Sequence, residues 1–210
     1  MNLQEILRHP AVWRGRDHGF HHARPDAARA LSTGFDALDE QLPEAGWPRG
    51  ALTEILFEHP GQGELRLLLP ALQRLTQQGD RLALIDPPWI PYAPALANAG
   101  VALSRLISIG PLNKADRLWA LEQALRSGHC RAVLAWPDDD LSTRDLRRLQ
   151  LAAEHGRASG FLFRPARLRV QHSPAALRLL IQPPDRLDIF KCRGRHFSHP
   201  IRIPELAIVA

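Results

Sequence analysis

The chain is poor in the residues that build disulfide frameworks and metal sites. Only two of its 210 residues are cysteines, Cys130 and Cys192, and they lie too far apart for a CxxC motif. We expect both to be ordinary free thiols. His18, His21 and His22 lie close together, but in a Gly-, Arg-, Ala- and Pro-rich segment without a neighbouring cysteine, which favours a mobile polar stretch over a metal site.

Long apolar runs are also missing. No uninterrupted stretch approaches the roughly 18 residues that cross a bilayer. The first ten residues, MNLQEILRHP, lack the basic start and long apolar core of a secretory signal. We therefore expect a cytoplasmic protein without membrane contact.

No nucleophile and base fall at a catalytic spacing. His129 and Cys130 are adjacent, but neighbouring residues of a strand point to opposite sides. A buried, inert thiol is the simpler interpretation of Cys130. We expect no enzyme and no cofactor.

The sequence does contain an alternation of apolar strand-like and amphipathic helix-like segments. Hydrophobic residues make up 45% of the chain, enough for one domain with a sizeable core. The alternation predicts an α/β fold with a mostly parallel sheet flanked by helices on both faces. The expected strands are 52–57, 81–85, 106–109, 131–136 and 160–163, and the expected helices are 65–77, 94–99, 114–127 and 143–156.

The ends of the chain follow a different pattern. Beyond Pro165, residues 168–170, 177–182 and 187–191 favour strands joined by Pro-containing turns, so we expect antiparallel strands toward the C-terminus. We divide the chain into a flexible N-terminal arm (1–30), an α/β domain (31–192) and an extended basic and apolar tail (193–210).

A glycine turn after the first expected strand has the outline of a phosphate-binding loop. Gly61 and Gly63 suit such a turn, but Glu64 and Leu65 stand where that chemistry needs lysine and serine or threonine. A glutamate there repels phosphate by roughly 4 kcal/mol per charge pair at an effective dielectric near 20. Pro70 makes the following helix begin late or bend.

The other positions for nucleotide hydrolysis are also altered. Asp86 is followed by two prolines instead of a carboxylate that polarises water. Trp136 ends the fourth expected strand, where a magnesium-linked aspartate normally lies. The three aspartates at 138–140 are an alternative position for that carboxylate, although solvation and the positive end of the helix that follows explain them more simply. We expect a degenerate nucleotide site.

Basic charge and tryptophan mark candidate contact surfaces. Residues 157–195 contain nine arginines and lysines but only two acids, which indicates contact with a polyanion or an acidic protein, or else a solvated arginine face. Trp47 and Trp89 are expected in proline-rich loops, where a tryptophan either anchors a partner or caps the core, and both are candidate partner anchors. Trp119 is expected on a helix core face. Lys191, Arg193 and Arg195 are the basic partner-binding candidates.

Two resemblances follow from these residues. The segments STGFDALD (32–39) and GWPRGALTEI (46–55) resemble the opening of the RecA ATPase core. Nearly the whole chain resembles the ImuA family. The resemblance rests on nine motifs in this order: VWRG, GWP, GxGEL, PPWIPYA, LRSG, VLAWP, LRRLQ, SPAALR and FKCRG. The related SulA family is similar through the middle, including LLLP (67–70) and GFLFRP (160–165).

The ImuA resemblance implies a non-catalytic, RecA-like adaptor of SOS-induced translesion DNA synthesis. Its implied partners are an ImuB-like protein, an error-prone replicative-type polymerase and RecA, with DNA as a further ligand of the basic C-terminal third. The main alternative is a SulA-type cell division inhibitor that binds FtsZ. A DNA-binding or nucleotide-sensing RecA-like protein is the second alternative.

Overall fold

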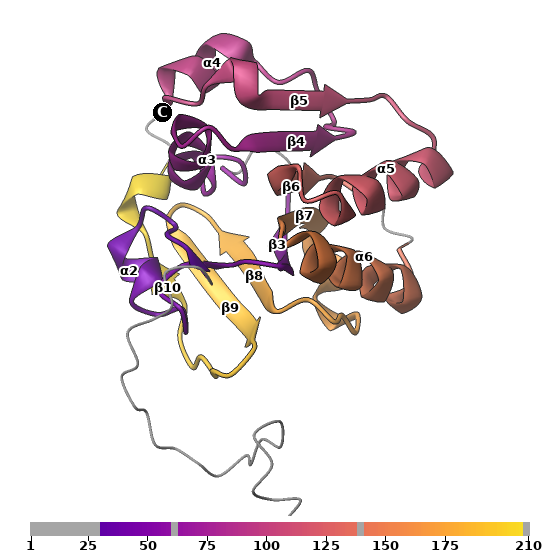
Figure 1. Cartoon of the computed structure of the whole chain (residues 1–210). Coiled ribbons are helices and arrows are strands. Elements are labelled where there is room, and N and C mark those ends of the chain that lie inside the picture. Colours follow the sequence, from indigo (N-terminus) through magenta and orange to yellow (C-terminus); the bar gives the residue numbers. More distant parts are fainter. Residues whose placement is uncertain (1–29, 60–62, 138–140, 208–210) are drawn as a thin grey trace, which may run out of the picture.

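Eight strands in one sheet form the centre of the protein (Figure 1). The computed structural model describes residues 30–59, 63–137 and 141–207, so most of the expected N-terminal arm lies outside the described residues. The sheet strands are β3 (Ala51–Phe57), β4 (Arg81–Ile85), β5 (Leu106–Ile109), β6 (Cys130–Ala135), β7 (Ser159–Pro165), β8 (Leu177–Gln182), β9 (Arg186–Cys192) and β10 (Ile201–Arg202). A separate two-stranded ribbon pairs β1 (Ala30–Leu31) with β2 (Trp47–Pro48).

Helices connect the strands. They are α2 (Asp36–Asp39), α3 (Leu69–Gln77), α4 (Ala93–Asn98), α5 (Lys114–Arg126) and α6 (Thr143–Gly156), with short 3-10 turns η1 (Leu103–Arg105), η2 (Ala166–Val170) and η3 (Pro204–Leu206). No helix of the described segments combines the length and the apolar character that crossing a membrane needs. Within the same segments, no group of three or more His, Cys, Asp or Glu side chains lies close enough to hold a metal ion.

The strand order is β10-β9-β8-β3-β7-β6-β4-β5. The strands from β8 to β5 in this order are all parallel, while β8 pairs with β9 and β9 with β10 in the antiparallel sense. This confirms the expected mixed α/β fold with a mostly parallel sheet and antiparallel strands toward the C-terminus. Because the sheet order ends at β5, this strand is an edge strand.

Two apolar cores lie on opposite faces of the sheet. One contains α3, α2 and the C-terminal turn η3, with Leu72 and Leu206 among its buried side chains. The other lies under the neighbouring helices α5 and α6, with Leu125 and Leu149 at its centre. Alternate residues of the central strands point into each core, which explains why β3 is buried along its whole length.

The helix boundaries follow from local chemistry. Helix α3 begins at Leu69, with Pro70 in its first turn, so the late start that this proline predicted is confirmed. Helix α6 has a capping box, in which the Ser142 hydroxyl and the Asp145 carboxylate accept each other's backbone N–H groups at 3.2 and 3.1 Å. The strands expected at 81–85, 106–109 and 177–182 agree with β4, β5 and β8 residue for residue.

Two predictions for the C-terminal third are corrected by the structure. Residues 168–170 belong to the 3-10 turn η2 and not to a strand, because Arg178 donates its guanidinium hydrogens to the carbonyls of Leu168, Arg169 and Gln171. The segment after Cys192, expected as an extended tail, adds β10 to the sheet and buries Ile203 in the core.

A buried ion cluster joins three neighbouring strands. Glu54 of β3 accepts hydrogen bonds from Arg178 of β8 (2.7 Å), from Ser173 (2.6 Å) and from Arg164 of β7 (3.4 Å). Glu54 and Arg164 are both fully buried. Burial, opposed by the charge of Glu54, lowers the pKa of Arg164. A removed partner would leave an uncompensated charge inside the protein.

Candidate interaction surface

The glycine turn lies directly before α3. Gly63 has a φ of +93°, which glycine adopts without strain, and its carbonyl accepts the amide of Leu67 at 3.0 Å. The side chain of Glu64 is folded inward, with Glu64 8% exposed, and Leu65 packs against the core. Gly61 lies outside the described residues. An inward carboxylate therefore stands where an active phosphate-binding loop has its lysine.

Asp86 fixes the loops at the carboxyl ends of β4 and β5. Its carboxylate accepts the Arg117 Nε hydrogen at 2.5 Å and the Leu112 amide at 3.2 Å, and its own amide donates to Ile109 at 2.7 Å. Asp86 has a φ of +50°, a costly conformation for a non-glycine residue. These contacts set the positions of the loop after β4 and of helix α5 relative to β5.

The loop after β4 exposes apolar and aromatic side chains. Trp89 is 65% exposed, Ile90 95% and Tyr92 72%. Prolines on either side restrict the backbone and reduce the entropy that binding would cost. This loop also borders a hollow of about 260 Å³, whose other wall contains Ser108 of β5 and Gly110, the residue after β5. We call residues 87–92 the tryptophan loop.

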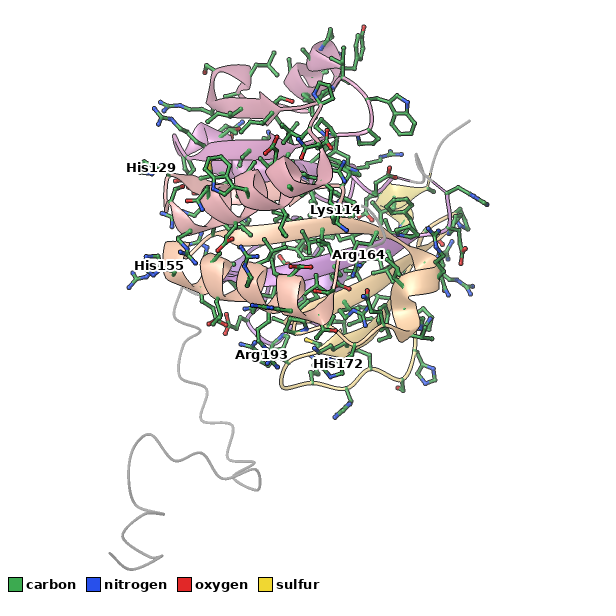
Figure 2. All side chains as sticks on the ribbon, turned by 90° about the vertical axis from the view of Figure 1, so that its right-hand side faces the viewer. Lys114, His129, His155, Arg164, His172 and Arg193 are labelled. Atoms are coloured by element: carbon green, nitrogen blue, oxygen red, sulfur yellow. The ribbon has the colours of Figure 1, made fainter. Side chains whose placement is uncertain are left out.

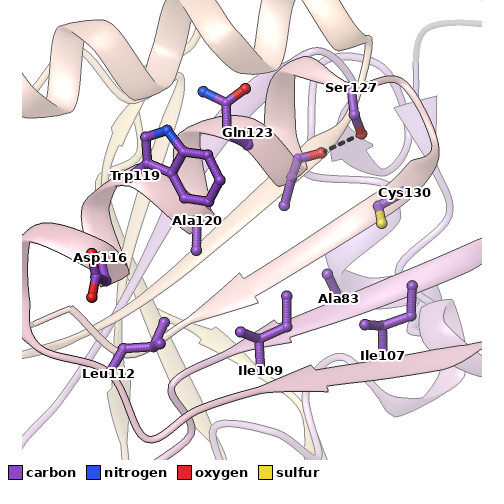
Figure 3. Close-up of a pocket in the computed structure, with 11 residues that line it drawn as sticks. Ala83, Ile107, Ile109, Leu112, Asp116, Trp119, Ala120, Gln123, Ser127 and Cys130 are labelled. Carbon is purple, nitrogen blue, oxygen red and sulfur yellow. Dashed lines mark hydrogen bonds between the residues drawn. The ribbon is translucent and has the colours of Figure 1, made fainter.

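The opposite face of β5 borders an apolar groove of about 490 Å³ (Figure 3). Ile107 and Ile109 line one side, and Trp119 and Gln123 of α5 line the other. Trp119 is 64% exposed, and the two isoleucines are 43% and 36% exposed. The groove is open because α5 packs against α6, β6 and β4 and leaves β5 uncovered.

The two surfaces meet at the edge strand. Ser108 and Gly110 face the tryptophan loop, while Ile107 and Ile109 face the groove, as alternation along a strand requires. Among the described residues, β5 has β4 as its only paired strand, so its other side carries backbone N–H and C=O groups without a strand partner. An exposed edge flanked on both faces by large apolar side chains is typical of an interaction surface.

The structure corrects the interpretation of two tryptophans. Trp47, a candidate partner anchor, is fully buried and packs edge-on against Phe161 at 5.6 Å between ring centroids. It is a core residue that no partner reaches. Trp119, expected on a core face, is instead a wall of the groove.

The three basic candidates lie near one another but differ in their contacts. Lys191 donates to the Ser173 carbonyl at 2.5 Å, and burial lowers its pKa. Arg195 donates to the Gln41 carbonyl at 2.6 Å and stands 5.5 Å from the Phe197 ring centroid, so it ties the C-terminal segment to the turn that follows α2. Arg193 is exposed and has no side-chain hydrogen bond to another described residue. Figure 2 shows its position at the lower surface.

The comparisons with known proteins point to one family. The model of the family "Cell division inhibitor SulA" matches residues 50–160, more than half of the chain. The chain belongs to the SulA family. A SulA from Cronobacter sakazakii is 34% identical over 119 residues, which cover 56% of this chain and 70% of that protein. One from Klebsiella pneumoniae is 32% identical over 148 residues, covering 70% and 85%.

A solved SulA structure is also similar. The crystal structure of SulA from Pseudomonas aeruginosa shares 29% sequence identity and a TM-score of 0.45, and the match covers 54% of this chain and 98% of that chain.

These matches overturn the main functional expectation. The chain was expected to be an ImuA-type translesion adaptor with an ImuB-like protein, a polymerase and RecA or DNA as partners. The family and its relatives are named as cell division inhibitors, so that function and those partners are wrong. The motifs that suggested ImuA lie partly outside the SulA match.

The SulA match contains both apolar surfaces. Residues 50–160 include the tryptophan loop, all of β5 and all of α5. They do not include Lys191, Arg193 or Arg195. The surfaces common to the family segment are therefore the apolar ones, and the basic C-terminal residues lie beyond it.

Proposed function

We propose that the protein is a cell division inhibitor that binds FtsZ and blocks its polymerisation. The observation that carries this proposal is the SulA match over residues 50–160, together with relatives of 31 to 34% identity that are named cell division inhibitors. Inhibition by binding needs no catalytic group, which agrees with the sequence expectation of a non-enzymatic protein. The setting we propose is the cytoplasm of a bacterium that responds to DNA damage.

The surface that we assign to FtsZ is the edge of β5 with its two apolar flanks. It lies inside the segment that matches the family, and it exposes Trp89, Tyr92 and Trp119, which are of the residue types that dominate binding energy at protein interfaces. The Asp86–Arg117 ion pair holds the two flanks in one arrangement before binding. Pre-organisation of this kind lowers the entropic cost of association.

Expression in a rod-shaped bacterium tests the function. The expected result is filamentous cells, because division stops while growth continues. In a sedimentation assay with GTP, purified protein should reduce the amount of FtsZ that pellets. Normal cell length together with unchanged FtsZ sedimentation would refute the proposal.

Matched variants test the surface separately. Trp89→Ala and Trp119→Ala should each weaken inhibition at least tenfold, equivalent to about 1.4 kcal/mol of lost binding energy. Val170→Ala is the control, because Val170 is 93% exposed and lies outside the shared segment. Inhibition that survives both tryptophan changes would move the FtsZ contact elsewhere and leave the function itself standing.

We also propose that the fold is a RecA-like core whose nucleotide site has degenerated. The support is the central place of β3 between β7 and β8, followed by a glycine turn that leads into α3. The buried Glu64 and the apolar Leu65 oppose phosphate and magnesium binding there. Titration with ATP and magnesium should give no micromolar binding, and a micromolar dissociation constant would contradict this proposal.

A further inference from the structure

A small polar pocket lies at the amino ends of the central strands, at the other end of the sheet from the tryptophan loop. Its volume is about 130 Å³. Arg49, directly before β3, and Arg193, directly after β9, both line it. The backbone of Gly46, Gly50 and Ala51 forms part of the wall.

The arginine side chains of this pocket lack acceptors. The Nε atom of Arg49 is buried and makes no hydrogen bond. In the described segments, neither Arg49 nor Arg193 forms an ion pair or a side-chain hydrogen bond with another residue. A buried guanidinium hydrogen without an acceptor is unfavourable, because it has lost water and gained no partner.

The charges around the pocket are mainly positive. Glu44 is the one carboxylate that lines it, and this residue is exposed to solvent, which screens its charge. Lys191 lies near by, and its pKa is lowered first by burial, then by the charges of Arg178 and, to a smaller extent, of Arg193. Arg193 thus adds to the positive charge near Lys191.

We infer that this pocket binds a phosphate-class oxyanion between the guanidinium groups of Arg49 and Arg193. A guanidinium offers paired N–H donors in one plane, which fit two oxygens of a phosphate group. Two such groups match the charge of a dianion.

The oxyanion pocket is independent of the proposed division inhibition. Arg193 lies outside the SulA match, and the pocket lies at the end of the sheet opposite to the tryptophan loop. A failure of either idea leaves the other unchanged. The phosphate source is free inorganic phosphate or the phosphate of an ester, and the two share the same recognition chemistry.

Thermal unfolding of the full chain with increasing inorganic phosphate tests the inference. The expected result is a saturable rise of the unfolding midpoint that sodium chloride at equal ionic strength does not reproduce. The variant Arg49→Gln with Arg193→Gln should bind phosphate at least about tenfold more weakly, since charged hydrogen bonds are lost. The control, Arg105→Gln with Arg186→Gln, removes the same charge from exposed sites outside the pocket and should bind as the wild type does.

The outcomes separate cleanly. A midpoint that follows ionic strength alone, or equal phosphate binding in the double variant, would overturn the inference. If the double variant does not fold, Arg193→Gln alone decides, because its side chain is exposed; unaltered binding in that variant counts against the pocket. Glycerol 2-phosphate as a second ligand identifies the source, since binding of both compounds supports an ester phosphate and binding of inorganic phosphate alone supports the free ion.

Discussion

At the scale of single residues, Glu54 is the carboxylate on which the buried ion cluster depends. Three donors converge on it, and none of the groups is near solvent. Glu54→Gln should lower the free energy of unfolding by about 3 kcal/mol or more, because two buried arginines lose their counter-charge. Urea unfolding measures this, with the exposed Glu205→Gln as control. A loss below about 1 kcal/mol would show that the cluster is not energetically important.

Arg164 should be the cheaper member of the same cluster to replace. Its Nε and Nη2 atoms are buried without acceptors, and its bond to Glu54 is long at 3.4 Å. Arg164→Met keeps the volume and removes an unfavourable desolvated charge, while Arg178 and Ser173 still satisfy Glu54. We expect Arg164→Met to destabilise less than Glu54→Gln in the same urea experiment. The reverse order would contradict this account of the cluster.

Cys130 should make stability depend on pH in the alkaline range. Burial raises the pKa of this thiol above its ordinary value of 9.0, with a smaller opposing effect of Arg81. Above pH 9 the unfolded chain loses the thiol proton while the folded chain keeps it, so this contribution to stability is full below pH 9 and declines as the pH rises. In Cys130→Ala, unfolding free energy measured from pH 8 to 10.5 should fall less steeply than in the wild type. Parallel curves would exclude the effect.

At the scale of elements, the capping box of α6 is a local device with a measurable contribution. Ser142→Ala removes the acceptor for the Asp145 amide and should cost about 1 kcal/mol. The double variant with Asp145→Ala should lose less free energy of unfolding than the sum of the two single variants, because each side chain accepts the backbone amide of the other residue. Chemical denaturation measures this, with the exposed Ser104→Ala as control. Additive losses would mean that the two contacts act independently.

The strands and capped helices were predictable because their signals are local. β4 and β8 are short apolar runs, and α6 is marked by Ser142 and Asp145, so a few neighbouring residues suffice. The 3-10 turn η2 was not predictable, because Arg178 organises its carbonyls from a later strand. Long-range contacts of that kind leave no pattern in the segment that they shape.

The two tryptophan errors have the same origin. Trp47 was expected in a proline-rich loop, but it belongs to β2, and its burial depends on Phe161 of a distant strand. Trp119 lies on α5, which leaves the adjacent face of β5 uncovered. The sequence of α5 does not show that the sheet ends at β5. Ile107 and Ile109 were missed as surface residues for that reason. The short length of β5 and the glycine and proline that follow it are weak signals of an edge.

At the scale of the whole molecule, the C-terminal segment closes one side of the core. Ile203 and Leu206 are buried, and Arg195 ties the segment to the turn that follows α2. A chain that stops after Gly194 should lose about 4 kcal/mol of stability from the exposed apolar surface. The midpoint of urea unfolding measures the loss, and Ile203→Ala alone should reproduce part of it. An unchanged midpoint would mean that the body is complete without this segment.

The fold class was predictable at this scale, but the function and the surface were not. Alternating segments predicted the mixed sheet, since covered parallel strands need connecting helices. Motifs scattered over the whole chain led to the wrong partner set, whereas the continuous segment 50–160 identifies the family. The tryptophan loop was found from its composition, and the groove required the three-dimensional position of β5.

The uncovered edge of β5 has a consequence for the protein in bulk. The unpaired backbone N–H and C=O groups of an edge strand can pair with an extended segment of another molecule, including a misfolded copy of the same protein. Purified protein should therefore aggregate as its concentration rises. The variant Ile107→Lys should stay in solution, because a charge on the edge strand opposes strand pairing, but it should also bind FtsZ more weakly.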